Sequence, residues 1–187
     1  MSMIKGHYDL VDTPLGQMGI VWTYDRGKPF VKRIYLPVEH GRLESKIRRD
    51  FQRAVKGVDS VIDRIGDAIR QYLNGGQGNL SLEYLDMNSC GEFQKKVLLL
   101  DRQIPQGKVA TYGELAKKIG SPKASRAVGN AQAANPFPII IPCHRVVRSD
   151  GALGGFGGGL AMKKRLLQLE GIVFDDAGKV RPEHRWP

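Results

Sequence analysis

The sequence predicts two domains of different class. An α/β N-terminal domain, with a small antiparallel sheet plus helices, precedes a mostly α C-terminal domain that contains a helix-turn-helix. Two observations carry this prediction: β-branched and aromatic runs between turn signals fill the start of the chain, and helix-capping signals crowd the second half. A chain of 187 residues can hold two small domains. We place them at 1–87 and 88–187.

The N-terminal domain begins with three predicted strands that turn signals separate, which is typical of an antiparallel meander. The strands are 7–12, 17–24 and 30–36. Apolar residues at helical spacing then predict two helices, 43–55 and 59–73, and Asn74-Gly75-Gly76 ends the second. The alternation from Leu80 to Leu85 predicts one more strand.

The C-terminal domain begins with three predicted helices. Ser89 and Glu92 form a capping box for a helix that reaches about Gln103, and Thr111 with Glu114 forms a second, for a helix that ends at Gly120. Ser121-Pro122 supplies an N-cap and a first-turn proline for a third helix. Two short helices joined by a glycine turn indicate a helix-turn-helix.

The third helix, roughly 122–134, consists mostly of small residues. Arg126 is a single long cationic side chain on that bare surface. Such a helix can pack tightly against a core, or it can approach DNA closely. The charge favours DNA: the net charge of +10 divides into +2 for residues 1–89 and +8 for residues 90–187, and a basic half is suited to a polyanion.

A thiol and an imidazole follow an apolar run that predicts a short strand. Ile139–Ile141 precede Pro142, and Cys143 and His144 come next. A cysteine reacts as the thiolate, which a nearby base promotes. The alternative is a buried structural thiol, a common fate of free cysteine.

A glycine-rich loop and a last helix close the domain. Six of the nine residues 151–159 are glycine, in a pattern that fits no nucleotide-phosphate loop. The loop can admit a substrate or move as a lid, or it can be plain flexible chain. The helix over 160–170 ends with Glu170, a carboxylate that opposes the helix dipole, before Gly171.

Composition excludes several classes of protein. No segment approaches the roughly 18 apolar residues of a membrane helix, so we expect no membrane contact and a cytoplasmic protein, or a nuclear one in a eukaryote. Two cysteines fit a reducing compartment. Without HExxH or CxxC motifs, we expect neither metal nor cofactor.

A series of motifs runs through residues 93–171 in one order. They are Phe93-Gln94, Ile104-Pro105, Thr111-Tyr112-Gly113-Glu114, Ser125-Arg126-Ala127-Val128-Gly129, Asn135-Pro136, Pro142-Cys143-His144-Arg145-Val146, Gly158-Gly159-Leu160 and Glu170-Gly171. Together they resemble the O6-alkylguanine-DNA alkyltransferases, or methylated-DNA–protein-cysteine methyltransferases. The first 85 residues match that family only loosely.

The resemblance implies DNA repair by direct reversal. The alkyl group of O6-alkylguanine, or of O4-alkylthymine, would pass irreversibly to Cys143 in one turnover, after minor-groove binding and base flipping. His144 would be the base, acting through a water, and Glu170 would orient it. Asn135 would hold the helix-turn-helix against the active-site turn, and Tyr112 would donate a proton to the leaving base. The implied partner is double-stranded DNA, bound by a monomer.

The resemblance also implies binding residues. Arg126 would fill the space of the flipped nucleotide, and the carbonyls of Cys143 and Val146 would accept from the guanine amino group. The DNA-binding set is Tyr112, Lys123, Ser125, Arg126, Ala127 and Gly129. The substrate pocket is Pro138, Val146, Phe156, Gly157 and Gly158.

Three departures from the family pattern qualify the resemblance. Phe156 stands where tyrosine is usual, so a hydroxyl is lost, and Gly157 stands where some members have serine. Residues 1–89 hold no cysteine, so the zinc site of some members is not expected. Rival functions are a non-catalytic binder of alkylated DNA, an alkylation-sensing transcription regulator and a Cys-His-Glu hydrolase.

Overall fold

The computed structural model describes residues 6–38, 42–76, 78 and 80–187. The chain forms two compact units. The first unit comprises Met1–Ser89 and the short segment Pro136–Ile140, and the second comprises Cys90–Asn135 and Ile141–Pro187. Nothing in the sequence pattern predicted that five residues from the middle of the second half belong to the first unit.

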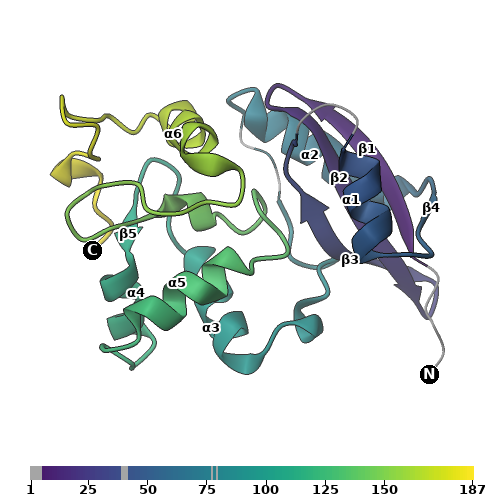
Figure 1. Cartoon of the computed structure of the whole chain (residues 1–187), viewed down its shortest axis with the longest axis horizontal. Helices are drawn as coiled ribbons and strands as arrows, with labels where there is room; N and C mark the ends of the chain where they lie inside the picture. Colours follow the sequence, from purple (N-terminus) through teal and green to yellow (C-terminus); the bar gives the residue numbers. More distant parts are fainter. Residues whose placement is uncertain (1–5, 39–41, 77, 79) are drawn as a thin grey trace. The chain divides into compact units, whose positions relative to one another are not determined.

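The first unit contains a four-stranded mixed sheet (Figure 1). Strands β1 (His7–Thr13), β2 (Gly16–Asp25) and β3 (Lys28–Tyr35) form the predicted antiparallel meander. A short strand, β4 (Val55–Lys56), pairs parallel to β1 and gives the order β3-β2-β1-β4.

Two helices accompany the sheet: α1 (Leu43–Asp50) and α2 (Ser60–Leu73). The prediction extended the first helix to residue 55 and was wrong there, because Val55 belongs to β4. Asp59 caps α2 by accepting from the backbone N–H of Val61 at 2.8 Å. The predicted strand from Leu80 to Leu85 was also wrong, since only Leu85 makes a bridge, to Val31. A 3-10 turn, η1 (Met87–Ser89), follows.

The second unit is mostly helical, as predicted. Its helices are α3 (Glu92–Asp101), α4 (Tyr112–Lys118), α5 (Ser125–Ala133) and α6 (Gly159–Leu169), with 3-10 turns η2 (Cys143–Arg145) and η3 (Pro182–His184). Strands β5 (Ala110–Thr111) and β6 (Val146–Val147) pair in parallel, so the residues just before α4 lie beside those just after η2. No helix in the described part of the chain is long and apolar enough to cross a membrane.

The three predicted helix starts have different outcomes. At α4 both bonds of the capping box form: Glu114 N donates to Thr111 Oγ1 at 3.1 Å, and Thr111 N donates to Glu114 Oε2 at 2.5 Å. The box at Ser89 is wrong, because the Ser89 hydroxyl donates to the carbonyl of Asp86, just before η1, and Gly91 is the N-cap of α3. The N-cap role of Ser121 is also wrong, because α5 begins only at Ser125, after Ala124.

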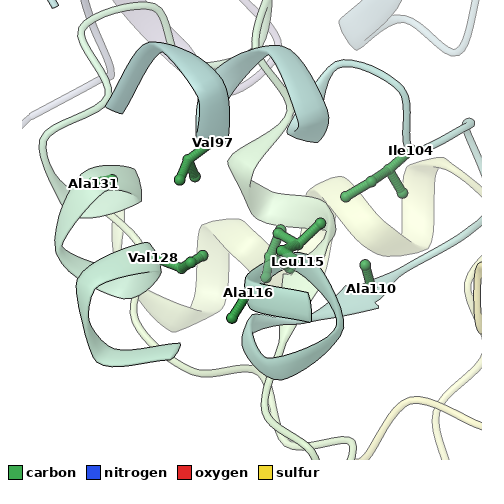
Figure 2. Packing of buried hydrophobic residues seen from close by; sticks show 8 residues of the cluster. Val97, Ile104, Ala110, Leu115, Ala116, Val128 and Ala131 are labelled. Atoms are coloured by element: carbon green, nitrogen blue, oxygen red, sulfur yellow. The ribbon is translucent and has the colours of Figure 1, made fainter. Parts of the chain in front are cut away.

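A cluster of buried apolar side chains holds α3, α4 and α5 together (Figure 2). Its members are Val97, Ile104, Ala110, Leu115, Ala116, Val128, Ala131 and Val146. Because α5 contributes only Val128 and Ala131 to this cluster, the rest of its small side chains are left for the surface or for other contacts. The helix-turn-helix is therefore anchored by one narrow face of α5.

The predicted strand over Ile139–Ile141 does not form. The backbone of Ile139 has a φ of 75°, a left-handed conformation that a β-branched residue rarely adopts and that no strand tolerates. Ile139, Ile140 and Ile141 are all buried, so the apolar run belongs to the core without forming the predicted strand.

Candidate active site

Cys143 is the first residue of η2, and its side chain is held by one amide. Asn135, which lies just after α5, donates from Nδ2 to Cys143 Sγ at 3.2 Å and to the Ile141 carbonyl at 3.1 Å. The thiol is 8% exposed. Burial raises the pKa of Cys143 to about 11, although the Asn135 hydrogen bond lowers it. The thiol is therefore protonated at neutral pH and needs a base before it can react.

His144 lies beside this thiol in sequence and is bound by a buried carboxylate. His144 Nε2 and Glu170 Oε1 are 3.0 Å apart, and both side chains are fully buried. Arg145 binds the same carboxylate through Nε and Nη2, at 2.9 and 2.7 Å from Oε1, and donates from Nη1 to the Ile104 carbonyl at 2.7 Å. Glu170 thus ties His144 and Arg145 into one buried network.

The network fixes the tautomer of His144. Burial raises the pKa of Glu170, but the bonds from His144 and Arg145 outweigh burial and lower it to about 2, so the carboxylate is ionised and can only accept. Burial lowers the pKa of His144, against the effect of Glu170, so the ring is neutral. A neutral imidazole that donates from Nε2 carries its basic lone pair on Nδ1.

A cavity of about 370 Å³ opens at the thiol. Its volume falls in the range of small-molecule sites, which suits a single nucleobase. It is lined by Tyr112, Gly129, Gln132, Ala133, Cys143, Gly155, Phe156 and Gly157. The Phe156 ring meets the His144 ring edge to face, with centroids 6.3 Å apart. An aromatic wall, a thiol and loop backbone together offer both stacking and hydrogen bonding to a flat ligand.

Tyr112, the first residue of α4, forms another wall of this cavity. A Cβ added to Gly154 would lie 2.9 Å from the Tyr112 hydroxyl, and Gly154 also has a φ of 66°. Only glycine therefore lets the loop over 151–159 approach the tyrosine so closely. Burial raises the pKa of Tyr112, as does the Cys143 thiolate, so the hydroxyl stays a hydrogen-bond donor.

A buried lysine binds the glycine-rich loop over 151–159 through a backbone carbonyl. Lys163 on α6 is fully buried and donates from Nζ to the Val146 carbonyl at 2.6 Å and to the Gly155 carbonyl at 3.3 Å. It therefore connects the cavity wall at Gly155 to the residue that follows η2. The Val146 carbonyl, which the family resemblance assigns to the guanine amino group, already accepts one hydrogen bond here.

A second hollow, a groove of about 530 Å³, lies along the exposed side of α5. Its lining is Tyr112, Gly113, Ser125, Arg126, Gly129, Arg148 and Ser149. Two arginines, three hydroxyls and no carboxylate line this groove, which suits a phosphate backbone. Tyr112 and Gly129 line both the groove and the Cys143 cavity, so a strand in the groove would lie next to the thiol.

Seven of the fifteen sequence-predicted site residues line one or both of these hollows. Three more lie in the hydrogen-bond network described above, since Asn135 bonds Cys143 and His144 bonds Glu170. Ala127 and Lys123 are exposed on or just before α5 but line neither hollow. Gly158 caps α6 without lining the cavity, and Val146 is buried. Pro138 falls in the segment that belongs to the first unit and does not line the cavity.

Among the residues of these hollows and their support that sequence reasoning missed are four polar ones, and Gly113, Ala133 and Gly155 were missed as well. Arg148 and Ser149 follow the Cys-His motif closely, and their charge and hydroxyl could have been weighed with Arg126. Gln132 and Lys163 gave no signal, because a polar residue on a helix is ordinary until its burial is known.

Comparison with known proteins identifies this arrangement. Residues 92–172 match the family model described as 6-O-methylguanine DNA methyltransferase, DNA binding domain. A methylated-DNA–protein-cysteine methyltransferase of Methanothermobacter thermautotrophicus is 44% identical over 115 residues, which is 62% of this chain and 64% of that protein. This chain therefore aligns with slightly less than two thirds of that relative.

Two further proteins align with more of the chain. A methylated-DNA–protein-cysteine methyltransferase of Mycolicibacterium paratuberculosis is 37% identical over 168 residues, covering 87% of this chain and 91% of that protein. The crystal structure of Mycobacterium tuberculosis OGT in complex with DNA superposes with a TM-score of 0.68 at 30% identity, over 88% of this chain and 92% of that one. The chain belongs to the methylated-DNA–protein-cysteine methyltransferase family.

Proposed function

We propose that this protein repairs DNA by moving an alkyl group from O6 of guanine to Cys143, once per molecule. The observation that carries the proposal is the thiol at the cavity, next to a histidine whose tautomer Glu170 fixes. Membership of the family and the likeness to a relative crystallised with DNA support it.

The chemistry assigns one task to each residue. His144 Nδ1 takes the Cys143 proton through a water, and Glu170 stabilises the imidazolium that forms. The thiolate then attacks the alkyl carbon, an S–C bond forms, and the C–O6 bond breaks with its electron pair on the guanine. The Tyr112 hydroxyl donates a proton to the leaving guanine, and the tyrosinate regains a proton from water. The thioether has no route back to a thiol, so the protein acts once.

The groove beside α5 gives a route for the substrate. The small exposed residues of α5 would enter the minor groove, and Arg126 and Arg148 would contact phosphate or the gap left by the flipped base. Flipping is required because an atom inside the stack cannot reach a buried thiol. One protein molecule would bind one lesion, and the first unit would support the second. A DNA substrate places the protein in the compartment that holds the DNA.

Intact mass after reaction with an O6-methylguanine duplex tests the proposal. We expect one added methyl group on Cys143 and no more than one equivalent of guanine restored per chain. Cys90→Ala is the matched control, because Cys90 is the other buried thiol, and it should still gain the methyl group.

The rival functions predict other results. Tight binding with unchanged mass would indicate a non-catalytic lesion binder, and repeated turnover would indicate a hydrolase. Cys143→Ala should lose transfer and keep DNA binding. Loss of binding as well would contradict the division of roles between cavity and groove.

A further inference from the structure

A buried acid and amide beside the Cys143 cavity have no task in the proposed reaction. Asp101, the last residue of α3, is fully buried and accepts from Gln132 Nε2 at 2.8 Å. Within the described part of the chain, Asp101 Oδ2 and Gln132 Oε1 are buried without any hydrogen-bond partner. Polar atoms left unpaired in an interior are costly, so their presence calls for an explanation.

The pair lies near the reacting groups. Gln132 lines the same cavity as Cys143, and Asp101 is close enough to interact electrostatically with Cys143, Tyr112 and Lys163. These three groups come from η2, α4 and α6. The Asp101 carboxyl therefore acts on the thiol, on the tyrosine and on the lysine that supports the cavity wall.

The other charged groups near α3 are already engaged. On η2, His144 and Arg145 both bind Glu170. On α5, Arg126 is exposed at the opposite end of the helix from Gln132. Lys163 Nζ donates to the carbonyls of Val146 and Gly155. Lys163 titrates in the same pH range as Asp101, because burial lowers the pKa of Lys163 to about 8.

The charge of Asp101 depends on pH in the range where the thiol reacts. Burial raises the pKa of Asp101 to about 8, against the Gln132 hydrogen bond and the Lys163 charge, which lower it. At neutral pH the carboxyl is therefore mostly uncharged. Once ionised, it raises the pKa of Cys143, because two negative charges in one buried site repel each other.

We propose that Asp101 is a positioning residue for alkyl transfer: held by Gln132, its uncharged carboxyl completes the site behind Cys143, and its ionisation opposes formation of the thiolate. The proposal rests on the proposed function for its biological meaning. The coupling between Asp101 and Cys143 is nevertheless a property of the protein alone. It can be measured without DNA.

The pH profile of Cys143 reactivity tests this coupling. Asp101→Asn keeps the shape and still accepts from Gln132, but it cannot ionise. In a Cys90→Ala background, the rate of Cys143 alkylation by iodoacetamide is measured by intact mass from pH 6.5 to 9.5, and single-turnover methyl transfer from O6-methylguanine DNA is measured alongside. The two variants should agree within about twofold at pH 6.5. Asp101→Asn should react about threefold faster or more at pH 9.5, since half a unit of thiol pKa changes the thiolate about threefold.

Two further variants make the result specific. Asp63→Asn, which removes an exposed acid on α2, should leave the profile unchanged. Gln132→Leu removes the hydrogen bond that lowers the pKa of Asp101. The pH at which ionised Asp101 begins to slow Cys143 alkylation should therefore be higher in Gln132→Leu than in the wild type. Parallel profiles for the wild type and Asp101→Asn would overturn the proposal. If the iodoacetamide profiles of the wild type and Asp101→Asn differ but no methyl transfer occurs, the proposed function would be overturned and the coupling would stand.

Discussion

Replacing Glu170 by glutamine should destabilise the second unit strongly. The carboxylate is fully buried and binds Arg145 through two nitrogens as well as His144. Its pKa falls from 4.5 to about 2, which at about 1.4 kcal/mol per unit corresponds to roughly 3 kcal/mol of stability. Glutamine also leaves Arg145 as a buried unpaired charge, a change that costs about 3–5 kcal/mol. We therefore expect a loss of about 3–5 kcal/mol at pH 7.

Guanidinium unfolding followed by tryptophan fluorescence measures this loss. The chain has two tryptophans, Trp22 in the first unit and Trp186, which packs on the core cluster of the second. In a Trp22→Phe background the signal therefore reports on the second unit. Asp150→Asn is the control, because its carboxylate pairs with Arg148 and Lys179 on the surface, and its unfolding midpoint should barely move.

The dependence on pH provides a second check. A lowered carboxyl pKa stabilises above the unfolded value of 4.5, and this contribution disappears as the pH falls toward 2. The difference in the free energy of unfolding between the wild type and Glu170→Gln should therefore shrink as the pH falls from 4.5 to 2. Adding Arg145→Met should recover part of the loss. A difference below about 1 kcal/mol at pH 7, or one that persists unchanged at pH 2, would refute this reasoning.

Four further substitutions have defined outcomes. Thr111→Ala breaks the capping box of α4 and should cost about 1 kcal/mol in the same unfolding assay. Arg148→Ala should weaken binding to damaged and undamaged duplexes alike and reduce the slope of log K against log salt by about one, whereas Arg126→Ala should slow methyl transfer more than it weakens binding. Since the pKa of Asp101 is raised to about 8, wild-type stability should fall between about pH 4 and 8, and Asp101→Asn should flatten that fall; equal slopes would contradict the assignment.

The sequence predicted correctly those elements that are determined by interactions between residues close together in the chain. The capping box at Thr111 formed because both partners lie within one turn, and the meander formed because its turns and strand periods agree. The box at Ser89 failed because a competing bond to Asp86 holds that residue in η1. The same motif can therefore cap a helix or close the preceding turn, and its neighbours decide.

The site itself was only partly predictable. Cys143, His144 and Glu170 could be brought together by resemblance, and the structure joins His144 to Glu170. Their neighbours Gln132 and Asp101 belong to helices whose contact is set by packing, so no local pattern marks them. Ile139 misled the strand prediction because its backbone conformation is imposed by its surroundings and is not a preference of isoleucine.

The five-residue segment Pro136–Ile140 also has a consequence for biosynthesis. The first unit is assembled from residues 1–89 and from this segment, and Ile34 N donates to the Pro136 carbonyl at 2.8 Å. A growing chain that has emerged only as far as residue 89 therefore lacks part of that unit. Its native packing cannot be completed until residue 140 has left the ribosome, by which point α3, α4 and α5 have also emerged. The second unit lies wholly within residues 90–187, but no contiguous piece of chain before that boundary contains the whole first unit. Truncation at the interdomain boundary would therefore release an N-terminal unit that lacks Pro136–Ile140.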